Sequence, residues 1–488
     1  MDSLLDYSTA LSNETDQEAL LALQNLITSP NNFLANNWTK TTSFCSWFGV
    51  TCSLKRPRVV ALALPNLQLQ GTISPSLANL SFLREPNLKN NLFHGGIPYG
   101  LGHLPRLRVI DIQNNQLKGN IPTSVFQHRR VQKISLAFNE FSGEMWKGPR
   151  ISGNLPNKFG NMSQLAFLSL IDNQLTGSIP AALFNISSLV GMSVSLNSLS
   201  GPLLLDEGNI VSNLEVLSMS YNQISGHIPS NICQLTQLKI LSISFNNVIG
   251  DIPRNIGCLS KLEEFYIGHN PIKGTIPASL GNTSTLRNLY CALNYLEGPI
   301  PPELAKLSNL CYFNISSLKY IGFNLNNLSG RIPTTTGFHL PNLISLVLGG
   351  NQLEGEIPLF ITNASNLKIL DLAGNFLTGT IPTNLGNLHE LQRLLLHSNQ
   401  LTNEPTEHEL RLFNSLVDCR MLRYLQVGSN PLNGVLPNSI GNVSSTIEIL
   451  YIGDTHLNGL IPQGHIAEAV CHLSNLVKLD MDRNEPQE

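Results

Sequence analysis

Apolar residues recur along the chain at fixed distances from an asparagine, in the pattern L-x-x-L-x-L-x-x-N-x-L. One clear copy places Leu107, Ile110, Ile112 and Leu117 around Asn115. The asparagine returns, usually every 24 residues, at Asn91, Asn115, Asn139, Asn173, Asn197, Asn222, Asn246, Asn270, Asn294, Asn326, Asn351, Asn375, Asn399 and Asn430, and the pattern fades at Thr455 and Asn484. Each copy fixes about seven positions in register with the others, so the chain is predicted to be a repeat array.

Elementary packing explains the residue types of each copy. Period-2 alternation in a short strand sends Leu241 and Ile243 inward and leaves their neighbours in solvent. Burial of each inward residue contributes roughly 1.5–3 kcal/mol, so stability accumulates through contacts between neighbouring turns. The buried asparagine amide can donate to and accept from the backbone of adjacent turns. The residues of the pattern are therefore interpreted as scaffold.

The N-terminal segment differs from the repeats. Residues 15–18 (TDQE) fit a capping box, and the apolar residues from Ala19 to Ile27 share roughly one helical face. The run leads to Trp38, Cys45, Trp47 and Cys52. A terminal repeat has an open apolar face, so a cap of this kind is expected.

These motifs resemble the leucine-rich repeats of plant receptor-like kinases and receptor-like proteins, whose repeats carry the words GSIP, GHIP, GDIP and GTIP seen here. The resemblance covers residues 15–484 and implies an α/β solenoid: a superhelix with a parallel inner β-sheet, and short 3-10 or extended segments outside. It also implies a helical N-terminal cap in which Cys45 and Cys52 form a disulfide.

The segment HELRLFNSLVDCRML, in the long step between Asn399 and Asn430, resembles the subgroup of the flagellin, elongation-factor and rice blight-resistance receptor kinases. In that family the ectodomain binds a peptide or protein ligand on its inner surface and recruits a co-receptor kinase of the somatic-embryogenesis type. A membrane helix then connects it to a serine/threonine kinase.

The sequence departs from that plan. Residues 1–14 lack a recognisable secretory signal, no run of about 18 apolar residues predicts a membrane span, and no kinase motif occurs. The cap is expected over residues 15–54 and about 17 turns over 55–488. We therefore interpret the chain as an incomplete ectodomain, from a truncated gene model or a degenerate locus.

Two long steps interrupt the period: 34 residues between Asn139 and Asn173, and 32 between Asn294 and Asn326. The first contains the inserted segment MWKGPRISGNLP. The second contains YFNISSL, which resembles the earlier LFNISSL, but about half a repeat is missing before it. Irregular structure is predicted at residues 145–151 and 310–318.

Charge limits the class of partner. The formal net charge is −3, and 13% of the residues are charged, so bulk electrostatics favours neither nucleic acid nor a membrane surface. No zinc-binding spacing of His or Cys occurs, and no G-x-S-x-G elbow, so neither a metal, a cofactor nor an enzymatic activity is predicted.

Asn-x-Ser/Thr sites indicate an extracellular glycoprotein, although abundant Asn and Ser would also produce some of them. They occur at Asn13, Asn37, Asn79, Asn161, Asn185, Asn282, Asn314, Asn327, Asn363 and Asn442. Cys291 replaces an inward leucine and is predicted to be a core residue. Cys233 and Cys258 occupy comparable places one turn apart, and whether they bond is left open.

We call the repeated asparagines the ladder asparagines, because their amides are expected to bond adjacent turns. Ligand binding is expected at the exposed strand positions, which lie one, two, four and six residues before each ladder asparagine. Most are small or polar, but those of the middle turns include aromatic residues, which dominate binding energetics. The predicted ligand-binding residues are Tyr221, Phe245, Glu264, Tyr266, His269, Asn288, Tyr290 and Tyr320. The alternative is that these rings only pack on one another along the inner sheet.

Two functions are compatible with these features. The first is the ligand-binding ectodomain of a plant receptor-like kinase in defence or development. The second is a kinase-less binding protein, such as a receptor-like protein, a decoy or a module resembling polygalacturonase inhibitors.

Overall fold

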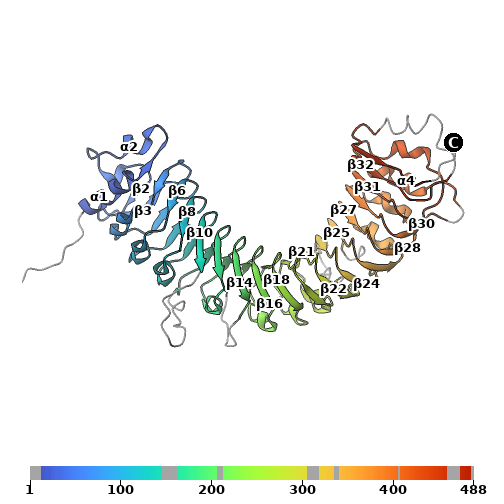
Figure 1. Cartoon of the computed structure of the whole chain (residues 1–488), viewed down its shortest axis with the longest axis horizontal. Helices are drawn as coiled ribbons and strands as arrows, with labels where there is room; N and C mark the ends of the chain where they lie inside the picture. The colour runs from blue at the N-terminus through green and yellow to red at the C-terminus, as the bar shows by residue number, and fades with distance from the viewer. Residues whose placement is uncertain are drawn as a thin grey trace, which may run out of the picture. The chain divides into compact units, whose positions relative to one another are not determined.

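The computed structural model describes residues 13–144, 162–205, 213–304, 318–334, 340–404, 407–458 and 473–484. The chain forms two compact units, unit 1 (Met1–Leu238) and unit 2 (Lys239–Glu488). Each unit is a stack of repeat turns, and in Figure 1 the strands of each follow one another in chain order. Within each unit the predicted leucine-rich-repeat solenoid is confirmed.

Within each unit, the first strand of each described turn pairs in parallel with that of the next turn. In unit 1 this inner sheet consists of β3 (Val59–Ala63), β5 (Glu85–Asn87), β7 (Val109–Asp111), β9 (Lys133–Ser135), β11 (Phe167–Ser169), β13 (Gly191–Ser193) and β15 (Val216–Ser218). In unit 2 it consists of β17 (Ile240–Ser242), β19 (Glu264–Tyr266), β21 (Asn288–Tyr290), β23 (Tyr320–Gly322), β25 (Ser345–Val347), β27 (Ile369–Asp371), β29 (Arg393–Leu395), β31 (Tyr424–Gln426), β32 (Ile449–Tyr451) and β33 (Lys478–Asp480). The inward residues Leu241 and Ile243 are 0% and 1% exposed, as the alternation predicts.

A second set of strands follows each ladder asparagine. In unit 1 it comprises β6 (Leu92–Gly95), β8 (Gln116–Gly119), β10 (Glu140–Glu144), β12 (Gln174–Gly177), β14 (Ser198–Pro202) and β16 (Gln223–His227). β4 (Gln70–Thr72) takes the same place in the first turn, and it pairs antiparallel with β1 (Ile27–Thr28) of the cap. In unit 2 it comprises β18 (Asn247–Asp251), β20 (Ile272–Gly274), β22 (Tyr295–Gly298), β24 (Asn327–Arg331), β26 (Gln352–Gly355), β28 (Phe376–Thr380) and β30 (Gln400–Thr402). The glycine of Gly-x-Ile-Pro here needs positive φ, as at Gly274 (φ +76°), where a Cβ would lie 2.7 Å from Asp251 Oδ1.

Short 3-10 helices connect the second strands to the next turn, and most begin directly after the repeat proline. They are η3 (Pro75–Asn79), η4 (Tyr99–His103), η5 (Thr123–Gln127), η7 (Ala181–Asn185) and η8 (Ser230–Gln234) in unit 1, and η9 (Ile256–Cys258), η10 (Ala278–Asn282), η12 (Leu359–Asn363), η13 (Thr383–Asn387), η14 (Leu416–Asp418) and η15 (Asn438–Asn442) in unit 2. The segment between Asn399 and Asn430 adds a helix, α4 (Arg411–Ser415), whose Leu412 and Phe413 are buried.

The ladder asparagines bond the turns together. Asn115 Nδ2 donates to the carbonyls of Leu88 and Ile112, both at 3.1 Å, and its Oδ1 accepts from Phe93 N at 3.0 Å. The pattern lapses at Thr455, which has no amide, but it resumes at Asn484, whose Oδ1 accepts from Thr455 N at 3.0 Å. The ladder therefore does not fade at Asn484, contrary to the sequence prediction.

The ladder also continues across both long steps. Phe141 N donates to Asn173 Oδ1, and Leu296 N donates to Asn326 Oδ1, each at 3.0 Å. β9 pairs with β11 and β21 with β23 in the same register as elsewhere. The predicted irregular segments themselves, 145–151 and 310–317, lie outside the described residues, whereas Leu318 is buried.

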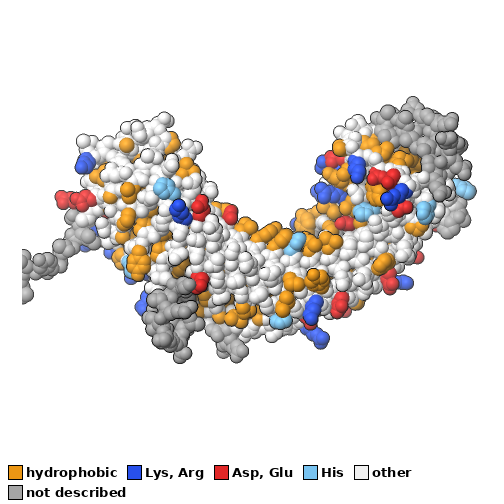
Figure 2. Space-filling view, viewed as in Figure 1, with side chains coloured by type: hydrophobic (Ala, Val, Ile, Leu, Met, Phe, Trp, Pro, Cys, Tyr) orange, Lys and Arg blue, Asp and Glu red, His pale blue; other side chains and the backbone are white. Residues whose placement is uncertain are grey.

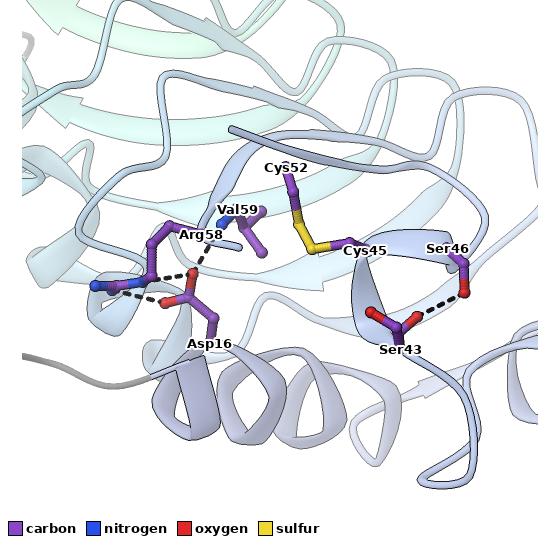
Figure 3. Close-up of a disulfide and its surroundings, with 7 residues drawn as sticks. All are labelled: Asp16, Ser43, Cys45, Ser46, Cys52, Arg58 and Val59. Carbon is purple, nitrogen blue, oxygen red and sulfur yellow. Dashed lines mark hydrogen bonds and ion pairs between the residues drawn. A yellow bond between two sulfur atoms is a disulfide. The ribbon is translucent and has the colours of Figure 1, made fainter. Parts of the chain in front are cut away.

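The N-terminal cap contains α1 (Asn13–Gln24), η1 (Pro30–Asn32), α2 (Phe33–Asn37), η2 (Phe44–Ser46) and β2 (Val50–Cys52), and β2 pairs antiparallel with β3. The predicted Cys45–Cys52 disulfide is confirmed (Figure 3). Trp38 and Trp47 stack with ring centroids 5.5 Å apart, and both are 2% exposed. The cap therefore covers its own apolar residues, as expected for the end of an array.

Asp16 fastens α1 to the first repeat. Its carboxylate accepts two hydrogen bonds from Arg58, at 2.8 and 3.0 Å, and one from Val59 N at 2.8 Å (Figure 3). The capping box predicted at residues 15–18 is wrong, because α1 begins at Asn13 and these residues lie inside it. The shared apolar face also ends early: α1 stops at Gln24, and Leu26 is 45% exposed.

Candidate ligand-binding face

Seven of the eight predicted ligand-binding residues lie on neighbouring turns of unit 2. We call them the aromatic strip: Phe245, Glu264, Tyr266, His269, Asn288, Tyr290 and Tyr320. Strand register places Glu264 beside Asn288, and Asn288 beside Tyr320. Two residues further along the same pair of strands, Tyr266 lies beside Tyr290. The eighth residue, Tyr221, belongs to unit 1 and is 49% exposed.

Tyr266 is held by its neighbours. Asn288 Nδ2 donates to its hydroxyl oxygen at 2.8 Å across adjacent strands. Burial raises the pKa of Tyr266, and the negative charge of Glu264 adds to the rise, although the Asn288 bond opposes it. The phenol is therefore neutral at physiological pH, and its hydroxyl hydrogen-bonds the side chains of both Asn288 and Glu264.

Tyr290 lies flat on the sheet because its neighbours have no side chains. A Cβ at Gly268 would lie 2.4 Å from the Tyr290 ring, and one at Gly322 would lie 2.7 Å from it. Tyr290 is half-buried by this contact. The ring therefore packs on the backbone of these two glycines.

Phe245 and His269 form a second pair at the position just before the ladder asparagine. Their rings stack with centroids 3.8 Å apart and planes 17° from parallel. Both have φ near +56°, where bulky side chains are rare. The residue before the ladder asparagine has a similar φ in most turns, including Leu293 and Leu325 of unit 2 and Phe138, Leu196 and Tyr221 of unit 1. This conformation therefore belongs to the repeat geometry.

A second group of side chains was missed by the sequence analysis. We call it the charged cluster: Asp371, Arg393, His397, Arg423, Tyr424, Glu448 and Tyr451. The Arg393 guanidinium lies 4.7 Å from the centroid of the Tyr424 ring, and Arg423 pairs with Glu448. His397 and Tyr451 meet edge to face at 5.9 Å. The signal that would have found the cluster is its charge, which an aromatic search ignores.

Tyr451 repeats the geometry of Tyr290. A Cβ at Gly428 would lie 2.5 Å from its ring, and one at Gly453 would lie 3.1 Å from it. Its hydroxyl bonds Ser429 Oγ at 2.9 Å. Two tyrosines on unit 2 therefore lie over glycines, one in each group.

Burial shifts both titrating groups at the centre of the charged cluster. It lowers the pKa of His397, although the Asp371 carboxylate opposes this. It raises the pKa of Asp371, although hydrogen bonding to Ala373 N and the charge of His397 oppose that. In the aromatic strip, burial lowers the pKa of His269 with no acid opposing it.

Figure 2 shows the contrast on one face of the molecule: acidic and basic side chains gather over β31 and β32, while apolar side chains surround the turn of β21. Between the two groups, the turns of β25 and β27 present the small residues Gly349, Gly350, Ala373 and Gly374. The inner face of unit 2 thus has an aromatic end and a charged end, which begins with Asp371 of β27, and small residues lie before the ladder asparagines of the turns between them.

The predicted glycosylation sites that the structure describes lie outside the inner strands. Five of the asparagines are the last residues of 3-10 helices: Asn79, Asn185, Asn282, Asn363 and Asn442. These five are exposed, as are Asn37 and Asn327. Asn13 begins α1, and Asn161 and Asn314 lie outside the described residues. Glycosylation itself stays a prediction.

Other candidate chemistry is limited. Cys291 is buried, as predicted, and burial raises its pKa; burial also raises the pKa of Cys419 to about 11. In the part of the chain that the structure describes, no cluster of His, Cys, Asp or Glu could hold a metal ion. Among the same residues, no helix has the length and hydropathy for a membrane crossing.

Comparisons with known proteins agree with this architecture. Family models for a leucine-rich-repeat region, a leucine-rich-repeat N-terminal domain and single leucine-rich repeats match residues 208–422, 13–53, and 106–127 with 421–443. All three describe repeats or their cap.

Curated relatives are plant receptor kinases. The LRR receptor-like serine/threonine-protein kinase EFR of Arabidopsis thaliana is 46% identical over 88 residues, which are 18% of this chain and 8% of that protein. A putative receptor-like protein kinase of the same plant is 40% identical over 97 residues, which are 20% of this chain and 10% of the relative. The matched segments thus span a tenth or less of these relatives.

Solved structures match over much more of the chain. The plant peptide hormone receptor RGFR1, in complex with RGF2, has a TM-score of 0.62 at 26% identity, covering 86% of this chain and 73% of the receptor chain. The PEPR1–AtPEP1 structure has a TM-score of 0.57 at 27% identity, covering 96% and 75%.

Proposed function

Because this chain belongs to the leucine-rich-repeat proteins, in the class that forms ectodomains of plant receptor-like kinases, we propose that the inner face of unit 2 binds an extended peptide outside the cell. The Cys45–Cys52 disulfide is typical of extracellular proteins. The chain acts here as the recognition part of a receptor in defence or development.

The observation that carries this proposal is the division of the inner face into an aromatic and a charged end. Four strand spacings separate β21 from β29 and six separate β21 from β32. At about 4.8 Å per strand these are about 19 and 29 Å. An extended peptide rises about 3.3 Å per residue, so roughly six to nine residues bridge the two groups.

The chemistry of the two ends defines the peptide. Tyr266 and Tyr290 offer apolar ring surface together with one hydroxyl, which suits an apolar or aromatic side chain. At the other end the charged cluster carries both signs, with the Arg393 guanidinium over Tyr424. The ligand is thus an amphiphilic peptide with an apolar half and a polar or charged half.

The relatives also suggest the further partners of this ectodomain. Family resemblance supports recruitment of a co-receptor kinase of the somatic-embryogenesis type once the peptide is bound. Glycans on the exposed sequons at the ends of the 3-10 helices would leave the inner face open.

A peptide selection tests the proposal. A library of random 12-residue peptides is selected on the full chain, and synthetic RGF2 and AtPEP1 serve as fixed probes. Because exposed aromatic anchors dominate binding energy, Tyr266→Ala with Tyr290→Ala is expected to weaken the selected peptides by roughly a hundredfold. The melting temperature should stay within a few degrees of the wild-type value.

The matched control removes Tyr295 and Phe376, two aromatic residues of the second strands of unit 2 that are 61% and 53% exposed. The Tyr295→Ala, Phe376→Ala variant should bind the selected peptides as tightly as wild type does. Unchanged affinity of the Tyr266→Ala, Tyr290→Ala variant, or equal losses in both variants, would reject the inner face as the site.

A further inference from the structure

Five arginines gather on three consecutive turns of unit 1. We call them the arginine edge: Arg84, Arg106, Arg108, Arg129 and Arg130. Arg84 and Arg108 each lie seven residues before a ladder asparagine, at the entry to an inner strand. Arg108 N donates to Arg84 O at 2.8 Å, so the two residues are stacked on adjacent turns.

The other arginines extend this edge. Arg106 and Arg130 each lie nine residues before a ladder asparagine, and Arg129 precedes Arg130. The Arg106 guanidinium lies 3.7 Å from the centroid of the Phe82 ring. Arg106 is half-buried, and the other four are exposed. The edge therefore presents two rows of cations that run from turn to turn.

None of these five side chains has an ion-pair partner within the described residues. The acids of the same turns are Glu85, Asp111, Glu140 and Glu144. Asp111 is buried and paired with Lys133 at 3.6 Å, and Glu140 and Glu144 lie on the second strand of the third turn. Like charges on neighbouring strands destabilise a sheet. The five arginines therefore form no stabilising ion pair among the described residues, although Arg106 also packs on the Phe82 ring.

The same positions in unit 2 form the opposite arrangement. Glu263 and Arg287, each seven residues before an asparagine, pair across adjacent turns at 3.5 Å. Lys368 likewise pairs with Glu390 at 3.9 Å. The repeat architecture therefore permits neutralised edges, and unit 1 departs from them by carrying arginine on both turns of each stacked pair.

We propose that the arginine edge binds an acidic polysaccharide of the polyuronate class, whose carboxylates lie along the edge from turn to turn. Arginine suits carboxylates, because its planar guanidinium donates two parallel hydrogen bonds. The net charge of −3 for the whole chain conceals this local excess of positive charge.

The regularity of the edge favours a polysaccharide over an acidic peptide. Strand pairing places the stacked arginines at a constant distance of about 4.8 Å. A polyuronate carries one carboxylate on every sugar ring, so its anions also recur at a constant interval. A peptide presents such a row only if acids occupy alternate positions of its sequence, because successive side chains of an extended strand point to opposite faces. Nucleic acid is disfavoured by the extracellular type of the Cys45–Cys52 disulfide.

Binding to immobilised polygalacturonate tests the inference with the full chain. The wild-type protein should bind at low salt and dissociate as salt screens the charges. Arg84→Gln, Arg108→Gln and Arg130→Gln combined should weaken binding by roughly tenfold or more, because three exposed charge contacts are lost. Fully methyl-esterified polymer, which lacks the carboxylates, should not bind.

The control removes equal charge from the matching column of unit 2: Arg287→Gln, Lys319→Gln and Lys368→Gln. This variant should bind as wild type does, and all proteins should share one melting temperature. Equal affinity of wild type and the unit 1 variant, equal losses in the control, or binding to the esterified polymer would overturn the proposal. Binding to dextran sulfate without binding to polygalacturonate would overturn it too. Peptide binding on unit 2 is unaffected by any of these results.

Discussion

Tyr290 in the aromatic strip and Tyr451 in the charged cluster lie on the inner face of unit 2 in the same way, each with its ring over two glycines. Their surroundings differ. Tyr290 has Tyr266 as its neighbour in register, whereas Tyr451 meets His397 and Ser429. The comparison teaches that glycines decide where a ring can lie flat, while the neighbouring side chains decide whether the place is apolar or polar.

Filling the glycine positions should have the largest effect on both groups. In Gly268→Ala the new Cβ would lie 2.4 Å from the Tyr290 ring and 2.9 Å from the Ala292 carbonyl oxygen; in Gly428→Ala the corresponding distances, to Tyr451 and the Gly453 carbonyl oxygen, are 2.5 and 2.7 Å. Overpacking of this kind costs about 1–3 kcal/mol, measurable as a change in the free energy of unfolding.

Two controls separate the ring from the backbone in that experiment. Gly268→Ala should cost less in a Tyr290→Ala background, because the ring is gone. Gly96→Ala should cost little, since its Cβ would meet no atom closer than 3.6 Å. A cost for Gly268→Ala that Tyr290→Ala leaves unchanged would show that the ring does not rest on this glycine.

Removing one carboxylate should separate the two histidines of the inner face. Asp371 opposes the lowering of the His397 pKa, whereas no acid acts on His269. Asp371→Asn should therefore lower the pKa of His397 further and leave that of His269 unchanged. Imidazole proton titration by NMR measures both values in one sample, and a parallel shift of the two would contradict the assignment.

A smaller effect is expected on the pH dependence of stability. The pKa of folded His397 is below the unfolded value of about 6.5, so the unfolded chain takes up protons first, and stability falls as pH drops below about 6.5. The raised pKa of Asp371 acts oppositely, because its stabilisation is present at low pH and lost as pH rises above about 4. His397→Gln should therefore lose less melting temperature than wild type between pH 7 and pH 5.5.

The smallest effect is expected at the rim of the charged cluster. Arg423 and Glu448 form an ion pair, which raises the pKa of Arg423 and lowers that of Glu448, but both side chains are solvated. Exposed pairs contribute little because water and salt screen them. Arg423→Gln should leave the melting temperature unchanged within measurement error, and a clear loss would mean that the cluster is structurally required.

Most of the scaffold could be predicted because it depends on local, repeated rules. The inward pair Leu241 and Ile243, the ladder role of Asn115 and the core position of Cys291 all follow from their places in one period. The capping box failed for the opposite reason: Asp16 bonds Arg58, which is 42 residues away, and no local rule contains that partner.

The candidate site could be predicted only in part. Tyr266 and Tyr290 were found because consecutive turns with one period bring them into register. The contact between His397 and Tyr451 escaped notice because two turns of unequal length separate them, and because the ring of Tyr451 reaches sideways over Gly428. The arginine edge of unit 1 and the ion pairs at the same positions of unit 2 also escaped notice, because a net charge of −3 for the whole chain does not show where charges lie.

The sequence by itself determined the repeat, the direction each strand residue faces, the ladder and the capped N-terminus, since short-range periodicity and burial are sufficient for these. Only the tertiary structure decided which exposed side chains meet, that the ladder crosses both long steps, and that unit 1 leaves its edge arginines unpaired. Those features depend on contacts between turns, and the distance between turns is set by strand pairing and not by the number of residues between them.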